Sequence, residues 1–75
     1  MTQLEVVYRY GAPPGEPEMR AMDAIREVYG VRRISFNEKD HTVRIEFDAS
    51  RLTADTIAGL LRGAGMDVRE KLVLA

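Results

Sequence analysis

The side chains of this chain that could bind a metal ion are a few sulfur and imidazole groups on separate segments. The sequence contains one histidine, His41, four methionines and no cysteine. Thioether and imidazole groups suit Cu(I), so Met66, His41 and Met19 are the ligands to consider. They lie far apart in the sequence, and a single histidine in a polar turn is usually only solvated. We therefore expect no metal site and keep these three residues as weak alternatives.

The chain offers little for catalysis. The absence of cysteine excludes thiolate metal sites, disulfides and thiol nucleophiles together. Asp40 and His41 are adjacent, an arrangement that no familiar catalytic mechanism requires. We expect a protein that is not an enzyme and that carries no cofactor.

The length and charge of the chain indicate one small domain, residues 1–75. Its 11 Lys and Arg nearly balance 12 Asp and Glu, so no strong field favours nucleic acid or an anionic membrane. No apolar run approaches the roughly 20 residues of a membrane span. The N-terminus lacks a basic segment followed by an apolar stretch, so we expect no signal peptide and a cytoplasmic protein.

The first half of the chain predicts a strand, a loop and a helix. Apolar and polar side chains alternate over residues 3–10, which is typical of a strand. The segment 11–15 reads Gly-Ala-Pro-Pro-Gly and is a loop by composition. Pro17 suits the first position of a helix, apolar residues recur at helical spacing as far as Val28, and Gly30 fits the position just after the helix.

The second half predicts a hairpin, a helix and a last strand. Alternating residues at 32–36 and 43–47 are separated by a polar turn at 37–41. Thr53 is a plausible N-cap for a helix that begins at Ala54 and that Gly65 terminates. Residues 68–74 form the final strand.

The order β-α-β-β-α-β predicts a specific topology. Two right-handed β-α-β crossovers give an α+β, ferredoxin-like sandwich: an antiparallel sheet of strand order 4-1-3-2 with both helices on one face. The sheet side that faces the helices should hold Ile34, Phe36, Val43, Ile45, Phe47 and Val68. In this topology the loop 11–17, the turn 37–41 and the segment 63–67 meet at one end of the sheet.

Several positions over residues 4–70 resemble the heavy-metal-associated (HMA) domain of copper chaperones and metal-pumping ATPases. They are Gly11, the Gly30-Val31 pair, I-x-F at 34–36, V-x-I-x-F-D at 43–48 and A-G-x-x-V at 64–68. The family pattern G-M-x-C-x-x-C begins at Gly11. Pro14 and Pro17 fall where its cysteines stand, and Ala12 replaces its methionine.

The resemblance implies a metal-domain scaffold that has lost its thiolates. In the family, the shared loop end holds the metal and also docks partner domains. Met66 falls at a position where the family usually has an aromatic residue beside the metal. The resemblance therefore marks a former metal loop, or partner loop, made of Ala12, Pro13, Pro14, Gly15, Glu16 and Pro17.

The first strand presents a conflict of register. The ungapped family alignment turns Glu5, Val7 and Arg9 toward the helices, whereas the alternation of the sequence turns Leu4, Val6, Tyr8 and Tyr10 there. A slip of one residue exchanges the two faces of a strand. We favour the second register, because burying Glu5 and Arg9 without partners would be costly.

The open face of the sheet should be charged. Its expected residues are Arg33, Ser35, Arg44, Glu46, Arg69 and Lys71. RNA-recognition modules with this topology stack bases on aromatic residues of that face, and here Phe36 and Phe47 point toward the helices. We therefore expect no RNA binding.

The last strand should be an edge that needs a cover. Leu72, Val73 and Leu74 are apolar in succession, and an exposed apolar edge is a pairing hazard. Arg69 and Lys71 protect only its first half. We predict a protein partner or a homodimer at this edge, with a frayed tail as the alternative.

Three functional hypotheses follow. The first is a non-catalytic interaction or regulatory module that kept the HMA scaffold. The second is a metal-handling protein that uses Met66, His41 and Met19. The third is a small-molecule sensor that binds its ligand between protomers, as ferredoxin-like regulatory domains often do.

Overall fold

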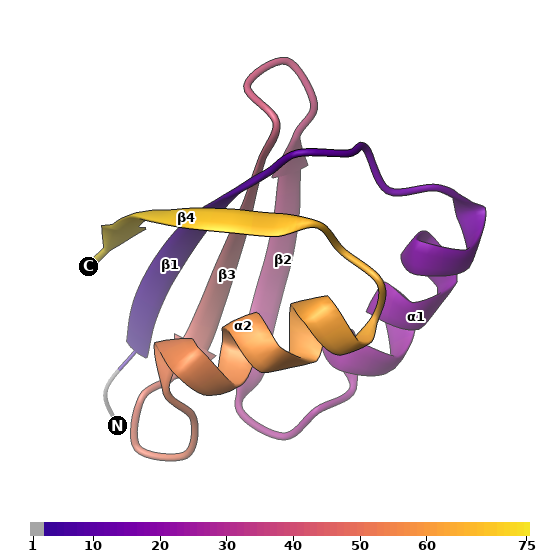
Figure 1. Ribbon diagram of the computed structural model, residues 1–75. Coiled ribbons are helices and arrows are strands. Elements are labelled where there is room, and N and C mark those ends of the chain that lie inside the picture. The colour runs from indigo at the N-terminus through magenta and orange to yellow at the C-terminus, as the bar shows by residue number, and fades with distance from the viewer. Residues whose placement is uncertain (1–2) are drawn as a thin grey trace.

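The computed structural model describes residues 3–75, and residues 1 and 2 of the expected domain lie outside the described part. Its elements are β1 (Gln3–Tyr10), α1 (Glu16–Arg26), β2 (Val31–Asn37), β3 (Thr42–Asp48), α2 (Ala54–Gly63) and β4 (Val68–Leu74). Figure 1 shows the sheet with α2 lying across it. The predicted order of two helices and four strands is confirmed.

The four strands form one antiparallel sheet of order β2-β3-β1-β4. This is the predicted order 4-1-3-2 counted from the other edge. The central pair is regular, with Val6 opposite Ile45, whereas the β1–β4 pair has register shifts on either side of Tyr8. The edges of the sheet are therefore β2 and β4.

A single apolar core joins one face of the sheet to both helices. Val6, Tyr8 and Tyr10 are at most 4% exposed, so the register that we favoured for β1 is confirmed. Glu5 and Arg9 form ion pairs instead, with Arg44 and Glu70, respectively. The predicted sheet core is also buried, except that Phe36 is only partly covered. The buried core residues are Val6, Tyr8, Tyr10, Met22, Ile25, Ile34, Val43, Ile45, Phe47, Ile57, Ala58, Leu61, Met66 and Val68.

Helix α1 begins one residue before the predicted start and ends well before the predicted end. Gly15 is the N-cap, and Pro17 is the second helical residue rather than the first. The helix ends at Arg26, so the prediction that Gly30 directly follows it was wrong. Apolar residues continue at helical spacing as far as Val28. The Val28 N–H, however, bonds to the Ile25 carbonyl three residues earlier, in a turn tighter than that of an α-helix. Gly30, with φ of 104°, instead turns the chain into β2, a conformation that favours glycine.

Helix α2 has the predicted signals at both ends. The Thr53 hydroxyl accepts a hydrogen bond from the Thr56 N–H at 3.1 Å, as an N-cap does. At the other end, the Met66 N–H bonds to the Leu61 carbonyl and the Gly65 N–H to the Arg62 carbonyl. With Gly65 at φ of 95°, these bonds form a Schellman motif. Within residues 3–75, neither helix has the length and apolar character that crossing a bilayer requires.

A tight polar turn follows β3 at the end of the sheet opposite the hairpin 37–41. Asp48 is 3% exposed, and its carboxylate accepts hydrogen bonds from the Ser50 N–H at 3.0 Å and hydroxyl at 2.7 Å. The Ser50 hydroxyl and N–H lower the pKa of Asp48 by stabilising its charged form. The Asp48 N–H donates to the Gly30 carbonyl at 2.7 Å, which links this turn to the start of β2.

Candidate functional site

Three loops meet at one end of the sheet, as the topology predicts. The Tyr10 N–H donates to the His41 carbonyl at 2.9 Å, which joins the end of β1 to the β2–β3 turn. The next N–H, of Gly11, donates to the Asp67 carbonyl at 2.9 Å, which joins the same strand end to the α2–β4 loop. The expected meeting of segments 11–17, 37–41 and 63–67 is therefore confirmed.

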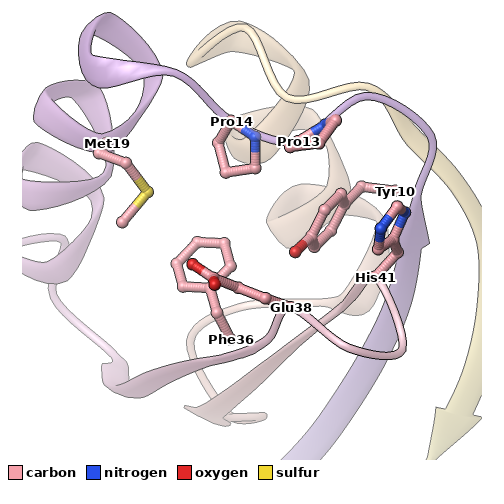
Figure 2. A pocket seen from close by; sticks show the side chains of 7 residues that line it. All are labelled: Tyr10, Pro13, Pro14, Met19, Phe36, Glu38 and His41. Atoms are coloured by element: carbon pink, nitrogen blue, oxygen red, sulfur yellow. The ribbon is translucent and has the colours of Figure 1, made fainter.

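A pocket of about 340 Å³ opens at this end, between β1, α1 and the β2–β3 turn. Figure 2 shows the side chains around it. Its walls are mostly apolar, and the polar groups belong to a tyrosine, a glutamate and a histidine. The lining residues are Tyr10, Pro13, Pro14, Met19, Phe36, Glu38 and His41.

Three rings in contact form the aromatic side of the pocket. Tyr10 meets Phe36 edge to face, with ring centroids 6.2 Å apart, and stacks on His41 with centroids 5.6 Å apart and planes within 4°. His41 has φ of 54°, a backbone conformation that histidine adopts several times more often than most residues. This turn conformation brings the imidazole against Tyr10.

The tyrosine and the glutamate of the pocket have no hydrogen-bond or ion-pair partner within residues 3–75. The Tyr10 ring is buried, but its hydroxyl is accessible, because no buried side-chain polar atom of the described residues lacks a partner. Figure 2 shows this hydroxyl pointing into the pocket. The Glu38 carboxylate likewise has no ion pair or hydrogen bond in the described part of the chain. Burial raises the pKa of Tyr10, and the negative charge of Glu38 raises it further. The charge of Glu38 therefore acts on the Tyr10 phenol.

The loop 11–17 is braced by hydrogen bonds at both ends. The Ala12 N–H donates to Asp67 Oδ2 at 3.2 Å, and the same oxygen accepts from Arg69 at 2.9 Å. At the helix start, the Glu18 carboxylate accepts from the Gly15 N–H at 2.8 Å. That carboxylate occupies the α1 N-terminus, which would otherwise attract an anion.

Most of the loop residues that the family resemblance singled out divide between the pocket and the start of α1. Pro13 and Pro14 line the pocket, whereas Gly15, Glu16 and Pro17 form the N-cap and first turn of α1. Glu16 also pairs with Arg20 one helical turn later. The loop thus ends in a helix start, with its two central prolines turned toward the pocket.

The three weak metal candidates are only partly brought together. Met19, 39% exposed, and His41 line the same pocket. Met66 is 4% exposed and packs in the core, so its thioether does not line that pocket. Within residues 3–75 no cluster of three or more His, Asp or Glu side chains could hold a metal ion.

The other face of the sheet is covered by paired charges. Arg44 lies 3.5 Å from Glu5, and Arg33 lies 3.8 Å from Glu46. Arg69, which we also expected on this face, bonds to Asp67. Tyr8 and Tyr10 are buried in the core, so neither tyrosine lies on this face. RNA-recognition modules carry their base-stacking aromatic residues there.

The edge strand β4 is exposed over its second half. Leu72, Val73 and Leu74 are 41%, 44% and 48% exposed, and β4 pairs only with β1. Lys71 is exposed as well. The predicted edge is therefore apolar and is not covered by any other segment of residues 3–75.

Sequence reasoning named Pro13, Pro14, Met19 and His41 as candidates but missed the other three residues that line the pocket. Tyr10 and Phe36 were predicted to be core residues, and Glu38 was one charge of a polar turn. A signal was available, since Tyr10 is the last residue of β1 and Phe36 is the last but one of β2, both at the loop end of the sheet. Two aromatic residues at that position indicate an apolar surface beside the loops.

Comparison of the sequence with protein-family models gave no match, and comparison with curated proteins gave no significant match.

Proposed function

We propose that this protein is a non-catalytic binding module with a ferredoxin-like fold, a relative of the HMA domain that has lost its metal ligands. The single observation that supports a binding role best is the apolar pocket at the loop end, which is lined by Pro13 and Pro14 of the former metal loop. Its place at that end, rather than elsewhere on the surface, links it to the family resemblance.

The ferredoxin-like assignment rests on topology. The βαββαβ order and the sheet order β2-β3-β1-β4 are those that this fold requires. The core contacts both helices from one face of the sheet. Family membership rests on Gly11, Gly30 and the strand motifs quoted above.

The loop lacks the side chains with which the family binds its metal. Pro14 and Pro17 stand where the two thiolates are expected, and proline has no side-chain ligand atom. Thiolates supply most of the affinity of such sites for Cu(I) and Zn(II). We therefore assign the module an interaction or regulatory role instead of metal transport.

Titration with Cu(I) and Zn(II) against a competing chelator tests this proposal. The purified protein should show no stoichiometric site of sub-micromolar affinity. A site of that affinity would overturn the proposal. If it disappeared in Met19→Ala or His41→Ala, the metal-handling alternative would replace it, because these two residues already line one pocket.

We also propose that the exposed edge of β4, from Arg69 through Lys71 to Leu74, pairs with a second copy of the chain. The exposed apolar side chains at its end and its single neighbour in the sheet support this proposal. A two-fold pairing of edges satisfies the open backbone groups of both copies at once.

A further inference from the structure

We propose that the loop-end pocket binds a small organic amine, a molecule with a flat apolar body and one ammonium group. This inference deepens the proposed binding function and rests on it. It names the chemical class of the ligand, which the family resemblance does not.

The apolar body is indicated by the walls of the pocket. Two prolines, the Met19 thioether and the ring of Phe36 line it, and Phe36 contacts Tyr10 edge to face. A flat ring inserted among these groups would replace water on several apolar surfaces. Met19 is 39% exposed, so contact with a ligand would bury apolar surface of its side chain.

The Tyr10 hydroxyl offers the ligand a polar contact. It makes no hydrogen bond within residues 3–75, and Figure 2 shows it directed into the pocket. The described residues contain no buried side-chain polar atom without a partner, so this hydroxyl is accessible from the pocket. A ligand that donates a hydrogen bond at this point would pair with it.

The charge of the pocket selects a cation. Glu38 is the charged acid among the lining residues, and none of them is a lysine or arginine. Its carboxylate has no ion pair in the described part of the chain, and it already acts on Tyr10 by raising the pKa of that phenol. An ammonium group would pair with Glu38 and also interact favourably with the face of an aromatic ring. A carboxylate ligand would be repelled.

The size of the pocket limits the ligand. A volume of about 340 Å³ lies near the lower end of the range for small-molecule sites. The pocket therefore suits a single-ring amine better than a large cofactor.

Titrations followed by amide NMR shifts can test this inference with two matched probes. The first is 2-phenylethylamine, and the second is 3-phenylpropionate, which keeps the ring and reverses the charge. The amine should shift residues 10–19 and 36–41, and it should bind about fivefold or more tightly than the carboxylate. Equal binding of the two probes, or shifts elsewhere, would overturn the inference.

Variants at Glu38 provide the second test. Glu38→Gln should weaken binding of 2-phenylethylamine about fivefold, whereas Glu27→Gln, an exposed change at the far end of α1, should leave it unchanged. Glu38→Lys should abolish amine binding and improve binding of 3-phenylpropionate. Unaltered amine binding in both Glu38 variants would refute the proposed pairing.

The two proposals fail in different experiments. A tight metal site would refute the proposed function without any amine titration. Tighter binding of 3-phenylpropionate would refute the proposed preference for a cationic ligand. It would leave the proposal of an apolar binding pocket in place.

Discussion

Substituting alanine for glycine at two positions should change stability in opposite directions. Gly30 connects α1 to β2 with φ of 104°, a conformation that side-chain-bearing residues rarely adopt. Gly59 lies in the interior of α2, and a methyl group added there would meet nothing within 4 Å. The same chemical change therefore tests the turn and the helix separately.

Gly30→Ala should destabilise the protein by about 1–2 kcal/mol. Backbone strain at an unfavourable φ costs on the order of 1–3 kcal/mol, and reduced entropy of the unfolded chain returns about 0.4–1 kcal/mol. The added methyl group would also lie 3.0 Å from Leu52 Cδ1 and 3.2 Å from Leu52 Cγ, so Leu52 must shift. The cost should therefore fall in the upper part of that range.

Gly59→Ala should stabilise the protein by about 0.5–1 kcal/mol, because glycine is the poorer helix former. Urea unfolding of both variants and the parent protein measures the two changes on one scale. For a domain of this size each kcal/mol corresponds to roughly 4–8 °C in Tm. A Gly30→Ala protein as stable as the parent would contradict the turn described here, and a destabilising Gly59→Ala would contradict the helix.

Three other outcomes are expected. The double variant Pro14→Cys with Pro17→Cys should bind Cu(I) in a chelator competition if the loop backbone still follows the family path, and a folded but metal-blind variant would show that the loop has been rebuilt. The parent protein should sediment as a dimer at about 100 μM, a concentration at which weak edge pairing is populated, and Val73→Lys as a monomer. If both sediment as monomers, β4 pairs with another protein or with none. Because the pKa of Asp48 is lowered in the folded state by its bonds from Ser50, its contribution to stability is present above about pH 4 and is lost as pH falls through the folded-state pKa. Acid unfolding should therefore be less steep in Ser50→Ala, and an unchanged pH profile would argue against these bonds.

The sheet and helices could be predicted from the sequence because apolar alternation and end signals agreed. Burial of Glu5 would have been costly, and that argument alone chose the correct register of β1. Thr53 was predicted to cap the start of α2, and its hydroxyl makes the capping bond. Gly65 was predicted to end the helix, and it lies in the Schellman motif there. These are local rules, and each acts within a few residues of the chain.

The candidate site could be predicted only in its location. Strand order determines that the loops meet, but the pocket depends on where Pro13 and Pro14 lie and on the turn conformation of His41, and both depend on contacts distant in sequence. The end of α1 was misjudged for a similar reason. Apolar spacing continues past Arg26, while the chain must already turn toward β2.

Asp67 gives the two proposed binding surfaces a physical connection. One of its oxygens holds the Ala12 N–H, next to the prolines of the pocket, and also the guanidinium of Arg69 in β4. Gly11 has no room for a side chain, since a methyl group there would lie 2.4 Å from Asp67 Oδ2. A displacement of the pocket loop must therefore move Asp67 or break its bonds, and either change reaches the first residues of β4. If a ligand displaces the pocket loop, we therefore expect the change to reach the first residues of β4 through this carboxylate.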